Sequence, residues 1–144
     1  DAAPRQLATE EQKTQVTEEL LENYDQFVAT RYMNMSMLST VTDRIVDQAL
    51  RTDSASLITL LMSSFDFDLT EDISRMTVPT LVIGSSLYFR GEGTPRQQLY
   101  AMGWDRAHDL VFKELDGVGH FAMLEAPTYL ATQILSFTKG SASR

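Results

Sequence analysis

The sequence predicts a mixed α/β protein in which a helical block precedes two parallel strands with flanking helices. Residues 1–65 carry apolar side chains at helical spacing. Residues 78–84 form a short apolar, β-branched run of the kind that parallel sheets bury on both faces. Residues 109–115 form a second apolar run, separated from the first by a helical pattern. A strand-helix-strand unit with a right-handed crossover follows from this order.

The helical block is predicted to contain three helices. The first covers residues 9–32, and Thr9 opens it with a Thr-x-x-Gln capping box. The second covers residues 41–50, with Thr40 as its cap, and the third covers residues 54–64. We place the boundary of this block after residue 69, so that residues 1–69 form a helical unit and residues 70–144 form the strand-containing unit.

The second unit is predicted to alternate helices with the two strands. Thr94 caps a helix whose first residue is Pro95, a position that proline favours. The predicted elements are a helical turn at 70–75, a strand at 81–84, a helix from residue 95, a strand at 110–115 and a helix at 127–138 that stops at Gly140.

Composition narrows the function classes. Of the 144 residues, 43% are hydrophobic and 22% are charged, as in globular proteins, and the net charge of -8 disfavours binding to nucleic acid. No apolar run reaches the roughly 18 residues that a membrane span requires. The absence of cysteine excludes thiol nucleophiles and thiolate metal sites, and two histidines are too few for a histidine-rich cluster. We therefore expect no metal and no cofactor.

A histidine follows the second strand directly. Residues 116–121 read Asp-Gly-Val-Gly-His-Phe, and the helix after them contains Pro127 at its start. Because ligands collect at the carboxyl edge of parallel sheets, His120 is the candidate functional histidine. His108 lies among charged residues and is expected to be a solvated surface residue. Glu125 could accept a hydrogen bond from a helix start or from the loop, and a solvated or capping role is the default expectation.

These motifs together resemble the α/β-hydrolase fold. The resemblance rests on the helical block, the Pro-Thr-Leu-Val-Ile-Gly run at 79–84, the Gly-His-Phe stretch at 119–121 and the Glu-Ala-Pro at 125–127, in this order and spacing. It implies that residues 1–69 are the inserted cap and that residues 70–144 are the C-terminal part of the core. It also implies that His120 is the general base of a serine hydrolase that cleaves an ester, amide or related acyl bond.

Two members of the catalytic triad that this resemblance implies are not evident. The family's Gly-x-Ser-x-Gly elbow does not occur, and Ser85 and Ser86 follow the wrong strand and lack the second glycine. Tyr88 stands close to where the family places an aspartate. Some members place the acid after the preceding strand, which makes Asp1 a candidate, with an ordinary strand-end role as the alternative. Glu92, between glycines in a loop, is a weaker third option.

The helical block offers candidate walls for a small, moderately apolar substrate pocket. Methionine alternates with polar residues at 33–37, which indicates either adaptable packing or a soft pocket lining. The candidate substrate-binding residues are Tyr24, Phe27, Tyr32, Met33, Met35, Met37 and Phe65.

Two strands leave one flank and one face of an apolar run such as residues 81–83 open to solvent. We therefore expect a partner to cover them, namely a separate N-terminal segment or chain that carries the nucleophile, or another copy of this chain in a homo-oligomer. The alternative from another class is a non-catalytic, hydrolase-derived module whose helices bind a ligand or a partner.

Overall fold

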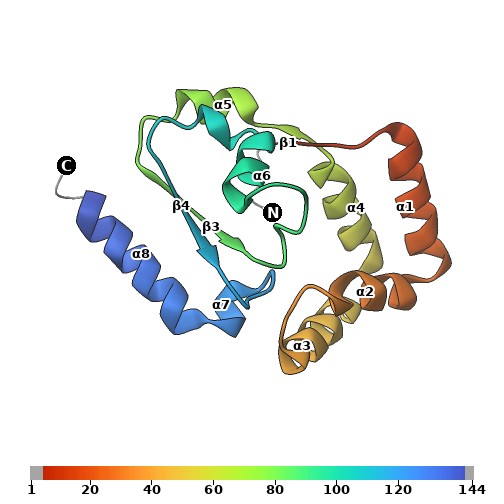
Figure 1. Ribbon diagram of the computed structural model, residues 1–144. Coiled ribbons are helices and arrows are strands. Elements are labelled where there is room, and N and C mark those ends of the chain that lie inside the picture. The colour runs from red at the N-terminus through yellow and green to blue at the C-terminus, as the bar shows by residue number, and fades with distance from the viewer. Residues whose placement is uncertain (1–4, 142–144) are drawn as a thin grey trace.

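The computed structural model describes residues 5–141 (Figure 1). The helical first half is followed by a parallel strand pair with helices around it. In chain order the elements are β1 (Arg5–Leu7), α1 (Glu10–Glu22), α2 (Tyr24–Met33), α3 (Ser39–Leu50), α4 (Ser54–Ser64), β2 (Asp66–Asp68), α5 (Thr70–Arg75), β3 (Thr80–Ser85), α6 (Pro95–Ala101), the 3-10 helix η1 (Trp104–Arg106), β4 (Leu110–Leu115), α7 (Ala122–Glu125) and α8 (Pro127–Ser141).

β3 and β4 form the predicted parallel pair. Their register runs from Thr80 opposite Leu110 to Ser85 opposite Leu115, and β4 has the bounds that the sequence predicted. α6 lies between them in the chain and begins at Pro95 with the predicted capping box of Thr94 and Gln97. Both strands therefore end at the same edge of the small sheet, which is the edge that carries His120.

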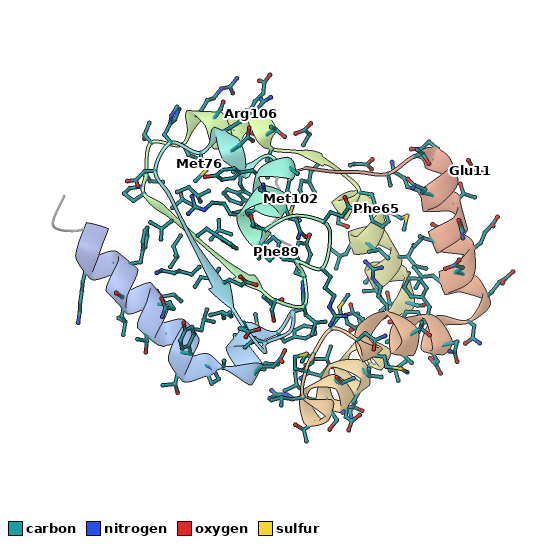
Figure 2. All side chains as sticks on the ribbon, viewed as in Figure 1. Glu11, Phe65, Met76, Phe89, Met102 and Arg106 are labelled. Atoms are coloured by element: carbon teal, nitrogen blue, oxygen red, sulfur yellow. The ribbon has the colours of Figure 1, made fainter. Side chains whose placement is uncertain are left out.

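α6 lies on one side of this strand pair and α8 on the other (Figure 1). On the α6 side, Val82, Phe89 and Leu99 form a buried cluster, and Met102 and Phe112 pack against it. Figure 2 labels Met102 at the end of α6 and Phe89 below it. On the other side, the side chains that face α8 come from Leu81, Val111 and Lys113. Successive side chains of a strand point to opposite faces of the sheet, so an almost continuous apolar run places apolar side chains on both faces.

The predicted long helix at 9–32 is wrong, because two helices occupy this range. α1 ends at Glu22, and Asn23 has φ -153° and ψ 77°, which is not helical. The Asn23 side chain accepts a hydrogen bond from the backbone N–H of Gln26 and so caps α2. The apolar spacing continues through the break, which is why periodicity alone did not reveal it.

The helical block also contains a short antiparallel pair, which corrects the prediction that residues 1–65 are all helical. β1 pairs with β2, so that Leu7 lies opposite Asp66. Lys13, in the first turns of α1, binds both Glu10 and Asp66, and thereby fastens α1 to β2. The division of the chain after residue 69 stays a prediction, and the pair lies within the first of the two units.

Other boundaries differ by a few residues. α3 begins at Ser39 with Leu38 in the cap position and without a side-chain cap, so Thr40 lies inside the helix. α8 continues through Gly140 to Ser141 rather than stopping there. Within residues 5–141, none of the helices has both the length and the apolar character needed to cross a bilayer.

The core beneath α6 provides a stability prediction. Leu99 is fully buried, whereas Leu60 on α4 is 66% exposed. Leu99→Ala removes buried methyl groups and leaves a cavity, so it should lower the free energy of unfolding by about 2–5 kcal/mol. Leu60→Ala is the matched control and should change it by less than about 0.5 kcal/mol. Urea denaturation measures both values, and equal effects of the two substitutions would contradict this packing.

Candidate functional site

The carboxyl ends of β3 and β4 open into a pocket of about 230 Å³. Its lining residues are mostly apolar or glycine, with Ser85, Tyr88 and His120 as the polar ones among them. The full lining consists of Ile83, Gly84, Ser85, Tyr88, Phe89, Leu115, Gly119, His120, Ala122 and Met123. The structure therefore places His120 where the sequence predicted a functional histidine, at the edge of a parallel strand pair.

The loop after β3 is fixed by aromatic packing and by one glutamine. Phe89 is buried and meets both Tyr88 and Phe112 edge to face, with ring centroids 5.5 and 5.4 Å apart. The Gln98 side chain on α6 accepts a hydrogen bond from the Gly91 backbone N–H and donates one to the Gly91 carbonyl. Phe89 therefore forms part of the pocket wall, and the loop that carries it is held in place by these contacts.

Gly84 lies directly under this aromatic group. A Cβ at Gly84 would overlap the Phe89 ring and would lie 3.0 Å from Cε2 of Phe112. The absence of a side chain at Gly84 is thus what allows Phe89 to fold back over the end of β3.

The loop after β4 turns sharply toward the pocket. Gly117 has φ +68°, a left-handed conformation that glycine adopts without strain. Its backbone N–H donates to the hydroxyl of Ser86 at 3.1 Å and to the carboxylate of Asp116 at 2.9 Å. Val118 is buried and anchors the loop. The loops that follow the two strands are therefore tied to each other.

Gly119 makes the closest backbone approach in this region. A Cβ at this position would lie 2.5 Å from the Met35 carbonyl oxygen, 2.7 Å from the Ser36 Cα and 2.8 Å from Oε1 of Glu125. Such distances leave no room for a side chain, so the turn between α2 and α3 packs directly on the backbone before His120. Figure 1 shows this turn beside the segment that joins β4 to α7.

His120 is held through its backbone. Its N–H donates to the Met35 carbonyl at 2.6 Å, and its ring meets Phe121 edge to face with centroids 5.2 Å apart. The residue as a whole is exposed to solvent. Partial desolvation is nevertheless the largest cause that lowers the pKa of His120 from its ordinary value, and nearby positive charges, Arg31 among them, lower it further. The lowered pKa favours the neutral imidazole, which is able to accept a proton.

Glu125 links the same two segments. Its Oε2 accepts hydrogen bonds from the backbone N–H groups of Gly119 and Met37, each at 3.0 Å. Its Oε1 is buried and has no hydrogen-bond partner among the described residues. The default expectation of a solvated or helix-capping role is therefore wrong, whereas the alternative, a hydrogen bond from the loop, is confirmed at Gly119. The bond from Met37 was not expected.

The other candidates for the catalytic triad are one aspartate, one glutamate and two serines. Asp1 lies outside the described residues, and the described residues that line the pocket include no carboxylate. Glu92 is exposed in the loop between β3 and α6. Ser85 lines the pocket, whereas the Ser86 hydroxyl accepts the hydrogen bond from Gly117.

The seven candidate substrate-binding residues of the helical block do not line the His120 pocket. Tyr24 donates its hydroxyl proton toward the carbonyls of Ala49 and Thr52, at 2.9 and 3.0 Å, and so holds α2 to the end of α3. Phe27 lines a separate groove between α1 and α2. The others are Tyr32 and Met35, which are half-buried, Met33 and Met37, which are more than half exposed, and Phe65, which lies at the end of α4.

His108 lies away from this pocket. It is exposed, and its Nε2 lies 3.1 Å from the Ser74 carbonyl at the end of α5. No group of three or more metal-ligating side chains was found in the described part of the chain. Of the two histidines, only His120 therefore lines the pocket at the ends of β3 and β4.

The fold and the site define a mixed α/β protein with a histidine at the end of a two-stranded parallel sheet. Among solved structures, it is similar to the esterase EaEST from Exiguobacterium antarcticum, with a TM-score of 0.74 and 13% sequence identity. The match covers 96% of this chain and 54% of the esterase, so the chain spans about half the esterase's length. No protein-family model matches the sequence, and no curated protein matches it. The likeness supports a hydrolase-like fold and does not by itself assign an activity.

The pKa of His120 gives a prediction for this site. Arg31→Gln removes a nearby positive charge and should raise the His120 pKa toward its ordinary value. Arg51→Gln is the matched control, because Arg51 pairs with Asp47 on α3. Ring resonances of His120 followed by NMR against pH measure the shift, which added salt should reduce. An unchanged His120 pKa in the Arg31 variant would reject the assigned electrostatic cause.

The same lowered pKa couples protonation to folding. Because the folded value lies below the unfolded one, the unfolded chain binds the additional proton first as the pH falls through about 6.5. The stability that neutral His120 provides is therefore present at higher pH and is lost below that value. Urea denaturation from pH 7.5 to 5.5 should show a smaller loss for His120→Gln than for the parent chain.

Proposed function

We propose that this chain is the cap and the histidine-bearing part of a serine α/β-hydrolase. The observation that carries the proposal is His120 at the carboxyl end of β4, held by backbone contacts and facing a mostly apolar pocket. The likeness to a bacterial esterase supports the same class. The substrate is a small, moderately apolar ester, amide or related acyl compound, in keeping with Ile83, Phe89 and Leu115 in the pocket wall.

In this function His120 is the general base. A serine hydroxyl attacks the substrate carbonyl carbon while the neutral imidazole takes the hydroxyl proton. The imidazolium then gives this proton to the leaving group as the acyl-enzyme forms. Water repeats the sequence and releases the acid. The lowered pKa of His120 favours the neutral form that the first step requires.

The nucleophile is proposed to come from a separate N-terminal segment or chain. The sequence contains no Gly-x-Ser-x-Gly elbow, and the hydroxyl of Ser86 is engaged with the Gly117 backbone. Among the described strands, β3 pairs with β4 alone. A strand placed against that pair and followed by a serine turn would bring the hydroxyl to the edge where His120 lies.

One observation favours a second candidate, a non-catalytic module derived from a hydrolase. No carboxylate occurs among the described residues of the His120 pocket, and a histidine base ordinarily has an acid that orients it. In this function the pocket binds a small apolar ligand without turnover, and Asp1 has no catalytic part.

Substitution of the two histidines separates the candidates. In the chain together with any polypeptide that co-purifies with it, His120→Ala should lower hydrolysis of p-nitrophenyl acetate by about four to six orders of magnitude, because the base is lost. His108→Ala is the control and should leave the rate unchanged, since His108 lies on the surface near α5. Equal rates for the parent and His120→Ala would reject the general-base role.

A covalent probe tests the source of the nucleophile. A fluorophosphonate reacts with an activated serine, so the natural preparation should contain a labelled polypeptide segment with a Gly-x-Ser-x-Gly elbow. Mass spectrometry of the labelled peptides identifies that serine. Labelling of Ser85 in this chain would contradict an external nucleophile, and no labelling at all would favour the non-catalytic module.

A further inference from the structure

We infer that Glu125 is a positioning residue that fixes the His120 loop to the turn between α2 and α3. Its catalytic meaning rests on the proposed function, whereas the physical linkage does not. Glu125 stands in α7, six residues after Gly119, and reaches back over the loop that precedes it. The residue neither lines the His120 pocket nor serves as the predicted cap.

One carboxylate oxygen holds two segments that are far apart in the chain. Oε2 accepts from the Gly119 N–H, six residues away, and from the Met37 N–H, 88 residues away. Hydrogen bonds to an ionised acceptor are about twice as strong as those between neutral groups. Removing the carboxylate would deprive two neighbouring backbone N–H groups of their acceptor. One of these hydrogen bonds, from Gly119, is partly buried.

Three further contacts converge at this point. The Met35 carbonyl accepts from the His120 N–H at 2.6 Å, and the missing Cβ of Gly119 allows the backbone at 35–36 to approach. Glu125 Oε1 is buried against Gly119. The backbone is therefore held at two successive residues: His120 donates its N–H to Met35, and Gly119 donates its N–H to Glu125.

The influence of Glu125 on His120 is mechanical rather than electrostatic. A carboxylate close to an imidazole raises its pKa, yet the pKa of His120 is lowered, chiefly by desolvation, and Glu125 is not among the causes of the shift. Glu125 contacts backbone groups, and through them it determines how closely the loop packs and how much of the ring is desolvated. Loss of the bridge should therefore expose the ring and raise the His120 pKa toward its ordinary value.

The turn between α2 and α3 takes part through its backbone. Met35 supplies a carbonyl and Met37 an N–H, while the Met37 side chain is 53% exposed. The methionine-rich segment that the sequence offered as a pocket lining thus meets the site through main-chain atoms. Side-chain changes at Met37 should leave the linkage intact, whereas changes at Glu125 should break it.

The experiment compares Glu125→Ala with two controls in the natural preparation, with any partner present. Glu114→Ala makes the same change at an exposed glutamate on β4, and Met37→Leu changes a side chain whose backbone makes the contact. NMR measures hydrogen exchange of the Gly119 amide and the pKa of the His120 ring. Glu125→Ala should accelerate the exchange by about tenfold or more and raise the pKa, and both controls should behave as the parent.

Unchanged exchange at Gly119 together with an unchanged His120 pKa in Glu125→Ala would overturn the inference. If this variant does not fold, Gly119→Ala opens the same contact from the other side, and an unchanged His120 pKa there overturns it equally. Where the preparation hydrolyses esters, Glu125→Ala should also lower kcat by about tenfold to a hundredfold with little change in KM. Absence of any hydrolysis, with the NMR changes present, would reject the proposed function and leave the positioning role standing.

Discussion

The contact between two backbones at Gly119 is the constraint on which the arrangement of this site depends. A glycine is required because a Cβ would lie 2.5 Å from the Met35 carbonyl oxygen. This approach allows the His120 N–H to reach the same carbonyl and the Glu125 carboxylate to bridge Gly119 and Met37. The turn between α2 and α3 and the loop after β4 thereby meet at the backbone that carries His120.

The second constraint is the packing at the end of β3. Gly84 leaves space for Phe89, which meets Phe112 from β4 edge to face and helps bury Leu99 of α6. The loop after β3 is thus folded back over the sheet, and Tyr88 and Ser85 remain at the pocket. One glycine allows a loop to approach the sheet and the other allows a turn to approach the histidine. The pocket lies between these two close approaches.

Elements whose signal is local could be predicted from the sequence, and contacts between distant segments could not. The bounds of β4, the capping box at Thr94 and the place of His120 after a strand follow from apolar period, cap chemistry and the glycines of the loop. The break at Asn23 escaped because the apolar spacing continues across it, and β1 escaped because three residues carry no period. The role of Glu125 depends on Met37, 88 residues away, and an acidic residue before a proline gives no sign of such a partner.

The backbone support of His120 also bears on what a catalytic acid would have to do. In a serine triad the acid holds the imidazole in place, selects its tautomer and stabilises the imidazolium. Here the loop that carries the ring is already fixed by the Met35 carbonyl and by Glu125. An acid at this site would therefore be needed to select the imidazole tautomer and to stabilise the imidazolium charge, more than to hold the ring in place. That division of tasks explains how a histidine can stand in a defined position while the described part of its pocket contains no carboxylate.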